Sequence, residues 1–139
     1  ALRSSGSFVR ALSLVAQLDG RLVGHVLFSR ILIKDGDHLH DGVALAPLSV
    51  LPDFQNMGIG SQLVRYGLEK YEKLGGKIVV VLGNRWNYTR FGFERASQYG
   101  IVPPFSLQDD QNFMVYAPSQ HILTQIKGTV IYPQPFGDL

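Results

Sequence analysis

Residues 48–71, LSVLPDFQNMGIGSQLVRYGLEKY, predict an apolar strand that ends at Pro52 and a helix that begins at a pair of glycines. The run 48–51 is mostly apolar, and proline followed by Asp53 ends it. In residues 55–60 the glycines let the backbone turn tightly enough to aim successive N–H groups at one point. The stretch therefore predicts a nest of backbone donors for an anion such as a diphosphate.

A helix of roughly four turns is predicted after this turn, because apolar or small residues recur at spacings of three or four. These residues are Ile59, Leu63, Gly67, Tyr71 and Leu74. A glycine inside a helix costs ~1 kcal/mol relative to alanine, so Gly67 indicates a close approach to a sheet. Gly75 and Gly76 predict a left-handed helix end. The first turn holds no Asp or Glu, which leaves the N–H groups of residues 57–61 for an outside anion.

The spacing Gln55-x-x-Gly58-x-Gly60 resembles the pyrophosphate loop of the GNAT superfamily of N-acetyltransferases, which binds acetyl-CoA. The nucleotide-binding patterns G-x-G-x-x-G and G-x-x-x-x-G-K-[ST] do not occur in the chain. By this resemblance acetyl-CoA is the co-substrate, held by Gln55, Asn56, Met57, Gly58, Ile59, Gly60 and Ser61. From the loop alone, a glycine-rich turn without a ligand stays an open alternative.

A second motif follows the next strand. Residues 77–82, KIVVVL, are typical of a buried parallel strand, so the order strand–helix–strand predicts a βαβ unit. The ending Tyr88-x-x-Phe91-Gly92-Phe93 resembles the short helix and turn of GNAT enzymes, in which the tyrosine points at the thioester sulfur. By resemblance Tyr88 protonates the departing thiolate, and the further cofactor-binding residues are Asn84, Asn87 and Arg90. Taken alone, Tyr88 also fits a packed aromatic side chain.

Residues 43–51 are apolar almost throughout, which predicts a central strand covered on both faces. Pro47 cannot donate to a ladder, so the strand is expected to bulge or lose its neighbour there. In GNAT folds the matching strand parts from the next one, and its exposed backbone binds the pantetheine arm of the cofactor. By resemblance that backbone belongs to Leu48, Ser49 and Val50.

The part of the chain before this strand predicts an antiparallel hairpin. Alternating residues from Leu12 to Leu18 and the run 22–33 flank a tight Asp19-Gly20 turn. Gly24 predicts a β-bulge. His25 beside it is a candidate base, although hydrogen-bonded packing is the more common role of a strand histidine.

The turn after the hairpin is crowded with ionisable residues. It is either an acidic rim for a cationic acceptor or an ordinary solvated loop. Its histidines lack the spacing of a zinc site, so no metal is predicted. The residues are Asp35, Asp37, His38, His40 and Asp41.

Composition fits one domain over residues 1–139, because a chain with 45% hydrophobic and 17% charged residues builds one core. The net charge of +2 and the dispersed basic residues give no indication of a nucleic-acid partner. The absence of cysteine excludes disulfides and a cysteine acyl-enzyme. No long apolar stretch or signal pattern occurs, so we expect a cytoplasmic protein without a membrane partner.

The predicted fold class is α/β (α+β), a GNAT fold with a mixed central β-sheet and helices on both faces. The segments L-x-P-L-S-V-L-P and V-L-G and the tail Tyr132-Pro133-x-x-Phe136 resemble the bacterial YhbS-like subgroup. GNAT folds open with a strand and a helical pair, and neither is recognisable before Leu12. Residues 1–10 receive no function. We therefore expect an abbreviated member or a fragment that binds acetyl-CoA but self-associates, for example as a homodimer, or acetylates poorly alone.

The resemblance implies direct acetyl transfer from acetyl-CoA to a primary amine of a small molecule or protein, in a ternary complex. Positioning, deprotonation of the amine, stabilisation of the tetrahedral oxyanion and protonation of the thiolate lower the barrier. The base is His25, Asp41 or a water relay. The alternatives are a non-catalytic acyl-CoA-binding sensor and a βαβ domain for another phosphorylated ligand.

Overall fold

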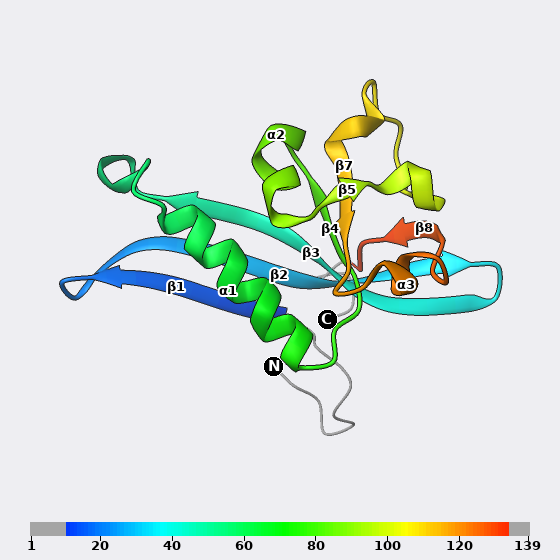
Figure 1. Ribbon diagram of the computed structural model, residues 1–139, viewed down its shortest axis with the longest axis horizontal. Coiled ribbons are helices and arrows are strands. Elements are labelled where there is room, and N and C mark those ends of the chain that lie inside the picture. Colours follow the sequence, from blue (N-terminus) through cyan, green and yellow to red (C-terminus); the bar gives the residue numbers. More distant parts are fainter. Residues whose placement is uncertain (1–10, 134–139) are drawn as a thin grey trace. The chain divides into compact units, whose positions relative to one another are not determined.

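The computed structural model describes residues 11–133 (Figure 1), and the chain divides into two compact units. Of the described residues, unit 1 contains 11–29 and 45–76, and unit 2 contains 30–44 and 77–133. Residues 1–10 and the tail position Phe136 lie outside the described residues. Strands β2 (Arg21–Asp35) and β3 (His38–Val50) contribute residues to both units. The single domain over residues 1–139 stays a prediction.

The predicted hairpin is confirmed in unit 1. Strand β1 (Ala11–Leu18) pairs antiparallel with β2, and the two residues of the turn, Asp19 and Gly20, have φ angles of 53° and 81°. Positive φ at both positions suits a two-residue hairpin turn. Ala16 faces Gly24 while Gln17 faces Leu22, so β2 carries one extra residue at this point. The bulge expected beside Gly24 is therefore present.

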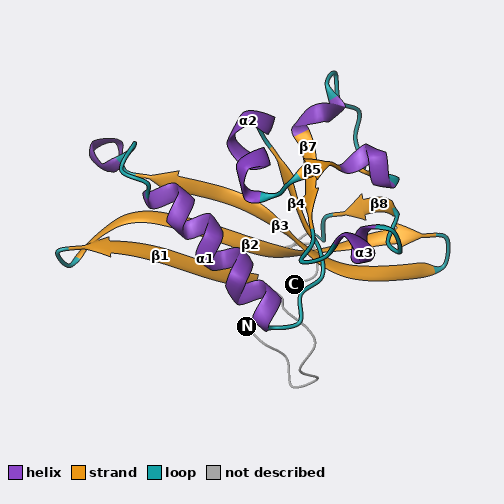
Figure 2. Ribbon diagram, viewed as in Figure 1, coloured by secondary structure: helices purple, strands orange, loops and turns teal. Residues whose placement is uncertain are grey.

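Helix α1 (Ile59–Lys73) packs on the hairpin, where β1 runs beside it (Figure 2). A Cβ atom on Gly67 would collide with the ring of Phe28 and lie 3.3 Å from Leu14 Cδ1. The close helix–sheet approach predicted from Gly67 is confirmed. The buried face of the helix consists of Leu63, Val64, Gly67, Leu68 and Tyr71.

The end of α1 also follows the prediction. Gly75 has a φ of +87°, which a residue with a side chain rarely adopts. The Gly76 N–H donates to the Tyr71 carbonyl at 2.9 Å, and the Gly75 N–H donates to the Glu72 carbonyl at 3.0 Å. These two bonds form a Schellman motif, which satisfies carbonyl groups at the helix end.

Unit 2 is built on strands that pair in both directions. β4 (Val79–Leu82) is parallel to β3 through two pairs, Val43 with Val79 and Ala44 with Val80. β4 is antiparallel to β7 (Phe113–Tyr116), which also pairs with β5 (Glu94–Arg95). β8 (Gly128–Ile131) is antiparallel to β2 and parallel to β6 (Ile101–Val102). The hydrogen-bonded order is β5-β7-β4-β3-β2-β8-β6, with β1 on β2, so the predicted mixed sheet and βαβ unit are confirmed.

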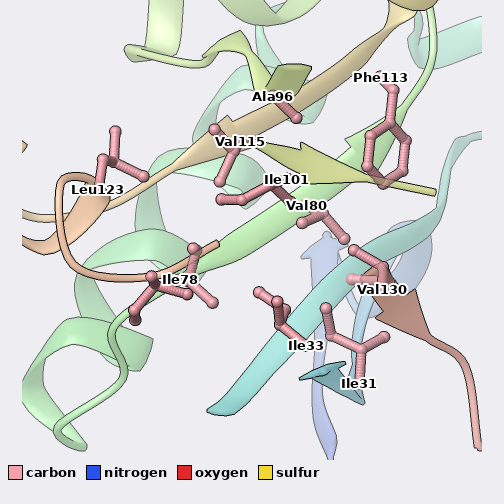
Figure 3. Close-up of a cluster of buried hydrophobic side chains, with 12 residues drawn as sticks. Ile31, Ile33, Ile78, Val80, Ala96, Ile101, Phe113, Val115, Leu123 and Val130 are labelled. Carbon is pink, nitrogen blue, oxygen red and sulfur yellow. The ribbon is translucent and has the colours of Figure 1, made fainter. Parts of the chain in front are cut away.

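The core of unit 2 is a cluster of aliphatic side chains and one phenylalanine (Figure 3). Gly42 lets β3 approach the segment before β4, since a Cβ there would lie 2.5 Å from Ile78 Cγ2. The Val43 N–H donates to the Ile78 carbonyl at 3.1 Å. The cluster contains Ile31, Ile33, Ala44, Ile78, Val80, Ala96, Ile101, Phe113, Val115, Leu123, Ile126 and Val130.

One fold prediction is wrong in part. Residues 42–45 of β3 are buried, but Ala46 and Ser49 are exposed and Leu48 and Val50 are half-buried, so the strand is not covered on both faces along its length. Its ladder with β4 ends at Ala44, three residues before Pro47. The sequence predicted that β3 loses its partner strand near Pro47, but it did not predict that side chains beyond the end of the ladder become exposed. An apolar run alone does not show where a partner strand ends.

Candidate functional site

The loop site, residues 55–61, lies in unit 1 between the short 3-10 helix η1 (Pro52–Phe54) and the first turn of α1. Asn56 and Gly58 have φ angles of +66° and +81°, so the backbone turns twice in the left-handed region. The Gln55 Nε2 donates to the Val50 carbonyl at 3.1 Å and closes the loop on the end of β3. The turn expected from the glycine spacing is therefore present.

The N-terminus of α1 presents backbone donors that the helix itself does not use. Gly58 is the N-cap, no side chain caps this end, and the first turn contains no acidic residue. The Gln62 N–H donates to the Gly58 carbonyl at 3.0 Å and is the first to find a partner one turn back. Helix geometry leaves the N–H groups of residues 58–61 without an intrahelical acceptor. Such a terminus attracts an anion.

Gly60 shows whether this turn fits a large anionic group. A Cβ atom here would lie 3.8 Å from Val50 Cγ2 and 3.9 Å from Leu48 Cδ2, which are ordinary contacts. The packing of the chain therefore does not require glycine at this position. A glycine that packing does not require, on a turn of free donors, fits close approach of a ligand to the backbone.

The other residues predicted for the cofactor in unit 1 surround this turn. Leu48 and Val50 border Gly60 from β3, and Ser49 is exposed on the same strand. The exposed members of the loop are Gln55, Asn56, Met57 and Gly58, and the half-buried ones are Ile59, Gly60 and Ser61. Unit 1 thus brings all ten predicted residues of the strand and loop together.

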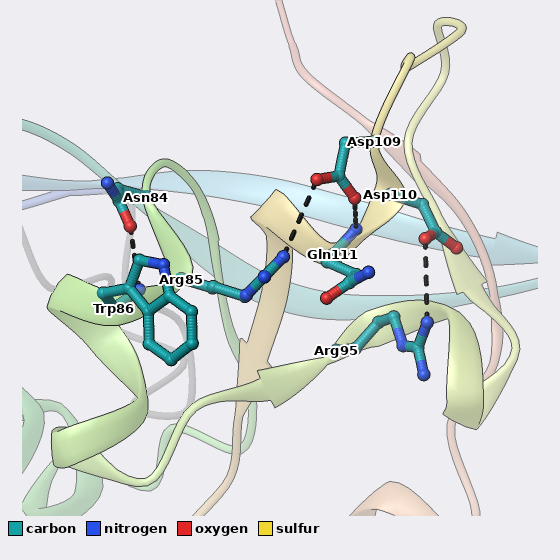
Figure 4. Close-up of polar contacts among 7 residues, drawn as sticks. All are labelled: Asn84, Arg85, Trp86, Arg95, Asp109, Asp110 and Gln111. Atoms are coloured by element: carbon teal, nitrogen blue, oxygen red, sulfur yellow. Dashed lines mark hydrogen bonds and ion pairs between the residues drawn. The ribbon is translucent and has the colours of Figure 1, made fainter.

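The tyrosine site, residues 83–93, follows β4 in unit 2 and contains helix α2 (Arg85–Tyr88) and the 3-10 turn η2 (Thr89–Phe91). Figure 4 shows how its start is held: the Asn84 Oδ1 accepts a hydrogen bond from the Trp86 N–H at 2.9 Å. Arg85 lies 3.7 Å from the Asp109 Oδ2 and 4.7 Å from the Trp86 ring centroid. The side chain of Asn84, predicted to bind cofactor, therefore caps α2.

Tyr88 is packed on three sides. Its ring lies edge-on to Phe93 at 5.7 Å between centroids and 6.5 Å from Phe91. On a third side, a Cβ atom added to Gly83 would lie 2.9 Å from Tyr88 Cε2. The alternative read from the sequence, an aromatic side chain that packs, is thus true of the ring.

The hydroxyl of Tyr88 is nonetheless available. Within residues 11–133 it has no hydrogen-bond partner, and Tyr88 as a whole is half-buried. Burial of the ring raises the pKa of Tyr88 above its ordinary value. The phenol therefore stays neutral near pH 7, where it can donate a proton.

The remaining predicted residues of unit 2, Asn87 and Arg90, are exposed. The Arg90 guanidinium lies 4.8 Å from the centroid of the Phe91 ring, a cation–π distance. Both residues flank Tyr88 on the same short segment, so the tyrosine site holds the predicted proton donor and the three predicted cofactor-binding residues of unit 2, whereas the candidate base Asp41 lies on β3.

The candidate bases have partners of their own. In unit 1, His25 Nε2 and Ser13 Oγ share a hydrogen bond of 3.0 Å. In unit 2, the Asp41 Oδ1 accepts hydrogen bonds from Arg30 Nε at 3.2 Å and Nη2 at 3.1 Å. The His25 bond is the hydrogen-bonded packing that was the alternative to a base. For Asp41 the alternative was an ordinary solvated loop, and its ion-paired side chain is 56% exposed.

No cluster of three or more metal-ligating side chains occurs among the residues that the structure describes. Within the same residues, no helix is both long enough and apolar enough to span a bilayer.

Sequence reasoning missed two contributors to the tyrosine site. Gly83 directly follows β4 and lies against the Tyr88 ring, and its N–H donates to the Asn112 carbonyl at 3.0 Å. Asp109 pairs with Arg85 and accepts from the Gln111 N–H at 3.0 Å, which caps η4 (Asp110–Asn112). The glycine was visible in the V-L-G segment, whereas nothing local in the sequence relates Asp109 to α2.

Comparison with known sequences matches residues 4–93 to the model of the Acetyltransferase (GNAT) family. The chain is 40% identical over 104 residues to the uncharacterized N-acetyltransferase YjhQ of Escherichia coli, and the match covers 72% of this chain and 56% of YjhQ. It is 33% identical over 126 residues to the uncharacterized N-acetyltransferase YhbS of the same species, and this match covers 90% of this chain and 74% of YhbS. The chain thus spans little more than half of YjhQ.

Comparison with solved structures gives the same picture. The crystal structure of YhbS from Escherichia coli in complex with CoA aligns with a TM-score of 0.80 and 32% identity, covering 90% of this chain and 68% of that one. A GNAT acetyltransferase from Brucella melitensis in complex with acetyl-CoA aligns with a TM-score of 0.68 and 34% identity, covering 89% and 67%.

Proposed function

Because the chain belongs to the GNAT family of acetyltransferases, we propose that it transfers an acetyl group from acetyl-CoA directly to a primary amine of a small molecule or a protein. The observation that carries the proposal is the loop site: a left-handed Gly58, four N–H groups without helical partners and a Gly60 that packing does not require. The two structural relatives that bind CoA and acetyl-CoA support the choice of ligand. We propose that the protein acts in the cytoplasm, because acetyl-CoA is available there.

In this proposal the loop site holds the diphosphate. The N–H groups of residues 58–61 donate to its oxygens, while the positive end of the α1 dipole offsets its charge. Gln55 keeps the loop closed through its bond to Val50. The exposed backbone around Ser49 holds the pantetheine amides. Asn87 and Arg90 offer exposed polar side chains to the cofactor. Asn84 supports the site indirectly, because its side chain caps α2.

The chemistry needs a proton donor and a proton acceptor. Acetyl-CoA supplies an acetyl group activated as a thioester. The amine nitrogen forms the new bond to the acetyl carbon, the carbon–sulfur bond breaks, and the Tyr88 phenol gives its proton to the sulfur. The amine loses a proton to His25, Asp41 or water, and solvent returns a proton to Tyr88. General acid catalysis of this kind contributes ~10²-fold or more.

Ligand specificity is the first test. A thermal-shift panel compares acetyl-CoA, CoA, ATP and NAD⁺, and we expect stabilisation by acetyl-CoA and CoA only. Equal stabilisation by ATP or NAD⁺ contradicts the proposal and favours a βαβ domain for another phosphorylated ligand.

Turnover is the second test. Release of CoA thiol is followed with a chromogenic disulfide, a clean assay here because the chain has no cysteine. Polyamines, aminoglycosides and a lysine peptide library serve as acceptors. Binding of acetyl-CoA without turnover on any acceptor would favour the non-catalytic sensor.

A further inference from the structure

The geometry points to Gly83 as a positioning residue for Tyr88. The tyrosine ring lies in the space that a side chain at position 83 would fill, so the glycine determines where the Tyr88 hydroxyl is presented. This inference rests on the proposed role of Tyr88 as proton donor. It adds a residue that neither the loop motif nor the tyrosine motif contains.

The Tyr88 ring lies too close to Gly83 to leave room for a side chain at position 83. A Cβ atom on Gly83 would lie 2.9 Å from Tyr88 Cε2, whereas carbon atoms of packed side chains lie about 3.5–4.0 Å apart. The other two ring atoms near this position are at 3.7 and 3.8 Å, so the ring lies across the glycine. An added methyl group therefore forces either the ring or the strand end to move.

The backbone at the end of β4 is held in place. The Gly83 N–H donates to the Asn112 carbonyl at 3.0 Å, and the preceding residue, Leu82, pairs with Phe113 in the ladder between β4 and β7. The backbone of Gly83 is thus tied to a neighbouring strand that begins one residue after Asn112. The ring, not the backbone, is the part that yields.

The Tyr88 ring has few directions in which to move. Phe93 and Phe91 stand at centroid distances of 5.7 and 6.5 Å, and both are buried. The ring of Phe93 also packs against the ring of Tyr116, with 5.5 Å between their centroids. The Phe93 N–H also donates to the Tyr88 carbonyl at 3.4 Å, which limits the backbone of α2. Gly83 and these two rings close three sides of the Tyr88 ring, so an added methyl group displaces the ring and its hydroxyl away from them.

Glycine at position 83 has no other evident purpose. Its φ angle is not among the positive values of the described residues, so the backbone conformation does not require glycine. Gly76 is a useful comparison, because a Cβ there would collide with the ring of Tyr71. Tyr71 is a core residue at 4% exposure, whereas Tyr88 is half-buried and carries the proposed proton donor. A glycine packed against a tyrosine ring therefore serves the core at Gly76, whereas at Gly83 it positions a side chain with a proposed role in the reaction.

The test is a double-mutant cycle. Gly83→Ala, Tyr88→Phe and the double variant are assayed at saturating acceptor for kcat and for the KM of acetyl-CoA. We expect Gly83→Ala to lower kcat about tenfold, since displacement of a catalytic group by ~1 Å costs up to ~10²-fold, with KM unchanged within about twofold. In the Tyr88→Phe background the alanine should change kcat less than about twofold. An effect of equal size in both backgrounds overturns the inference.

A second readout needs no cofactor. The phenol titration of Tyr88 is followed by NMR of the apo-protein with ¹³Cζ-labelled tyrosine, and Tyr88→Phe assigns the resonance. Gly83→Ala should shift this titration toward lower pH, because the displaced ring loses burial. An unchanged titration together with wild-type kcat overturns the inference. Gly76→Ala is the matched control, and it should lower the melting temperature while leaving the Tyr88 titration in place.

The outcomes separate the inference from the proposed function. If Tyr88→Phe retains wild-type kcat, the proposed proton donor is wrong, and a shifted titration in apo Gly83→Ala still shows that Gly83 sets the ring. If Tyr88→Phe lowers kcat and Gly83→Ala does not, only the inference fails. Should Gly83→Ala not fold, Phe93→Leu removes the ring edge beside Tyr88 and enters the same cycle with the same expected non-additivity.

Discussion

At Gly60, protein stability and ligand binding should respond to one substitution with opposite signs. Gly60 is the second residue of α1, where a carboxylate interacts favourably with the helix dipole and where glycine costs ~1 kcal/mol relative to alanine. Gly60→Asp should therefore keep or raise the free energy of unfolding. The same carboxylate repels the diphosphate at the loop site, so acetyl-CoA binding should weaken by at least ~2 kcal/mol. Urea unfolding and calorimetric titration measure the two effects.

Gly60→Ala is the control for this position. The added methyl group meets only ordinary contacts within the chain at 3.8 and 3.9 Å, so the variant should be more stable than the wild type. Because the methyl group takes space from the diphosphate but adds no charge, acetyl-CoA binding should weaken less than in Gly60→Asp. A folded Gly60→Asp protein with wild-type affinity for acetyl-CoA would remove the loop site from the proposed function.

Tyr88 should separate binding from chemistry. Its hydroxyl is needed only when the thiolate leaves, so Tyr88→Phe should lower kcat by about 100-fold and leave the affinity for acetyl-CoA nearly unchanged. The ring remains against Phe93 in the variant, which preserves the packing. Calorimetry and steady-state kinetics on an identified amine test the prediction. Turnover at the wild-type rate would assign the proton donor to water or to another group.

The pH dependence of stability follows from the same residue. Burial raises the pKa of Tyr88 above the ordinary ~10, so the folded state holds the phenol proton more tightly than the unfolded state. This contribution is fully present below about pH 10 and is lost as pH rises through the folded pKa. Burial also raises the pKa of Tyr99 and Tyr132, and both remain in Tyr88→Phe.

The difference in unfolding free energy between wild type and Tyr88→Phe isolates Tyr88 in this measurement. It should stay constant from pH 7 to about pH 9 and then fall as the pH increases further. Urea titrations at each pH give the curve. A difference that stays flat at alkaline pH would show that Tyr88 titrates alike in the folded and unfolded states.

At the scale of elements, the seating of α1 depends on Gly67. Alanine would add ~1 kcal/mol of helix propensity, but its methyl group would collide with the Phe28 ring. Overpacking of this kind costs ~1–3 kcal/mol, so Gly67→Ala should lower the free energy of unfolding despite the better propensity. Urea unfolding measures the change. The loss should be smaller in a Phe28→Leu background, and a stabilised Gly67→Ala would contradict the close packing of helix and hairpin.

The elements that the sequence predicts well are those whose cause is local. The Asp19-Gly20 turn, the limits of α1 and its Gly75 stop each depend on residues within one turn of the feature. β5 and α3 (Gln120–Leu123) were missed, because two and four residues are too few to show a hydrophobic period. The exposure of Ala46 and Ser49 was missed because it depends on where β4 ceases to pair, which is a property of another segment.

The same division applies to the candidate site. Gln55, Gly58, Gly60 and Tyr88 could be identified because their spacing resembles family motifs. Their surroundings could not: Asn84 caps a helix, and the ring of Tyr88 lies on Gly83. These contacts arise from packing between segments, and no periodicity or spacing in the sequence encodes them.

At the scale of the whole molecule, the chain order couples the two units. Strands β2 and β3 each run from one unit into the other, so neither unit is a continuous stretch of chain. Loss of either strand removes ladder pairs from both units. We therefore expect one cooperative unfolding transition and not two.

Two probes report on the units separately. Helix α1, with 15 residues, is the longest described helix and lies in unit 1, so it dominates the far-UV circular dichroism signal. Trp86, the one tryptophan of the chain, lies in unit 2, where Arg85 stacks on its ring. In urea, the dichroism and the tryptophan fluorescence should give the same midpoint. Gly67→Ala perturbs unit 1 alone and should lower both midpoints equally, whereas a shift confined to the dichroism would show that the units unfold independently.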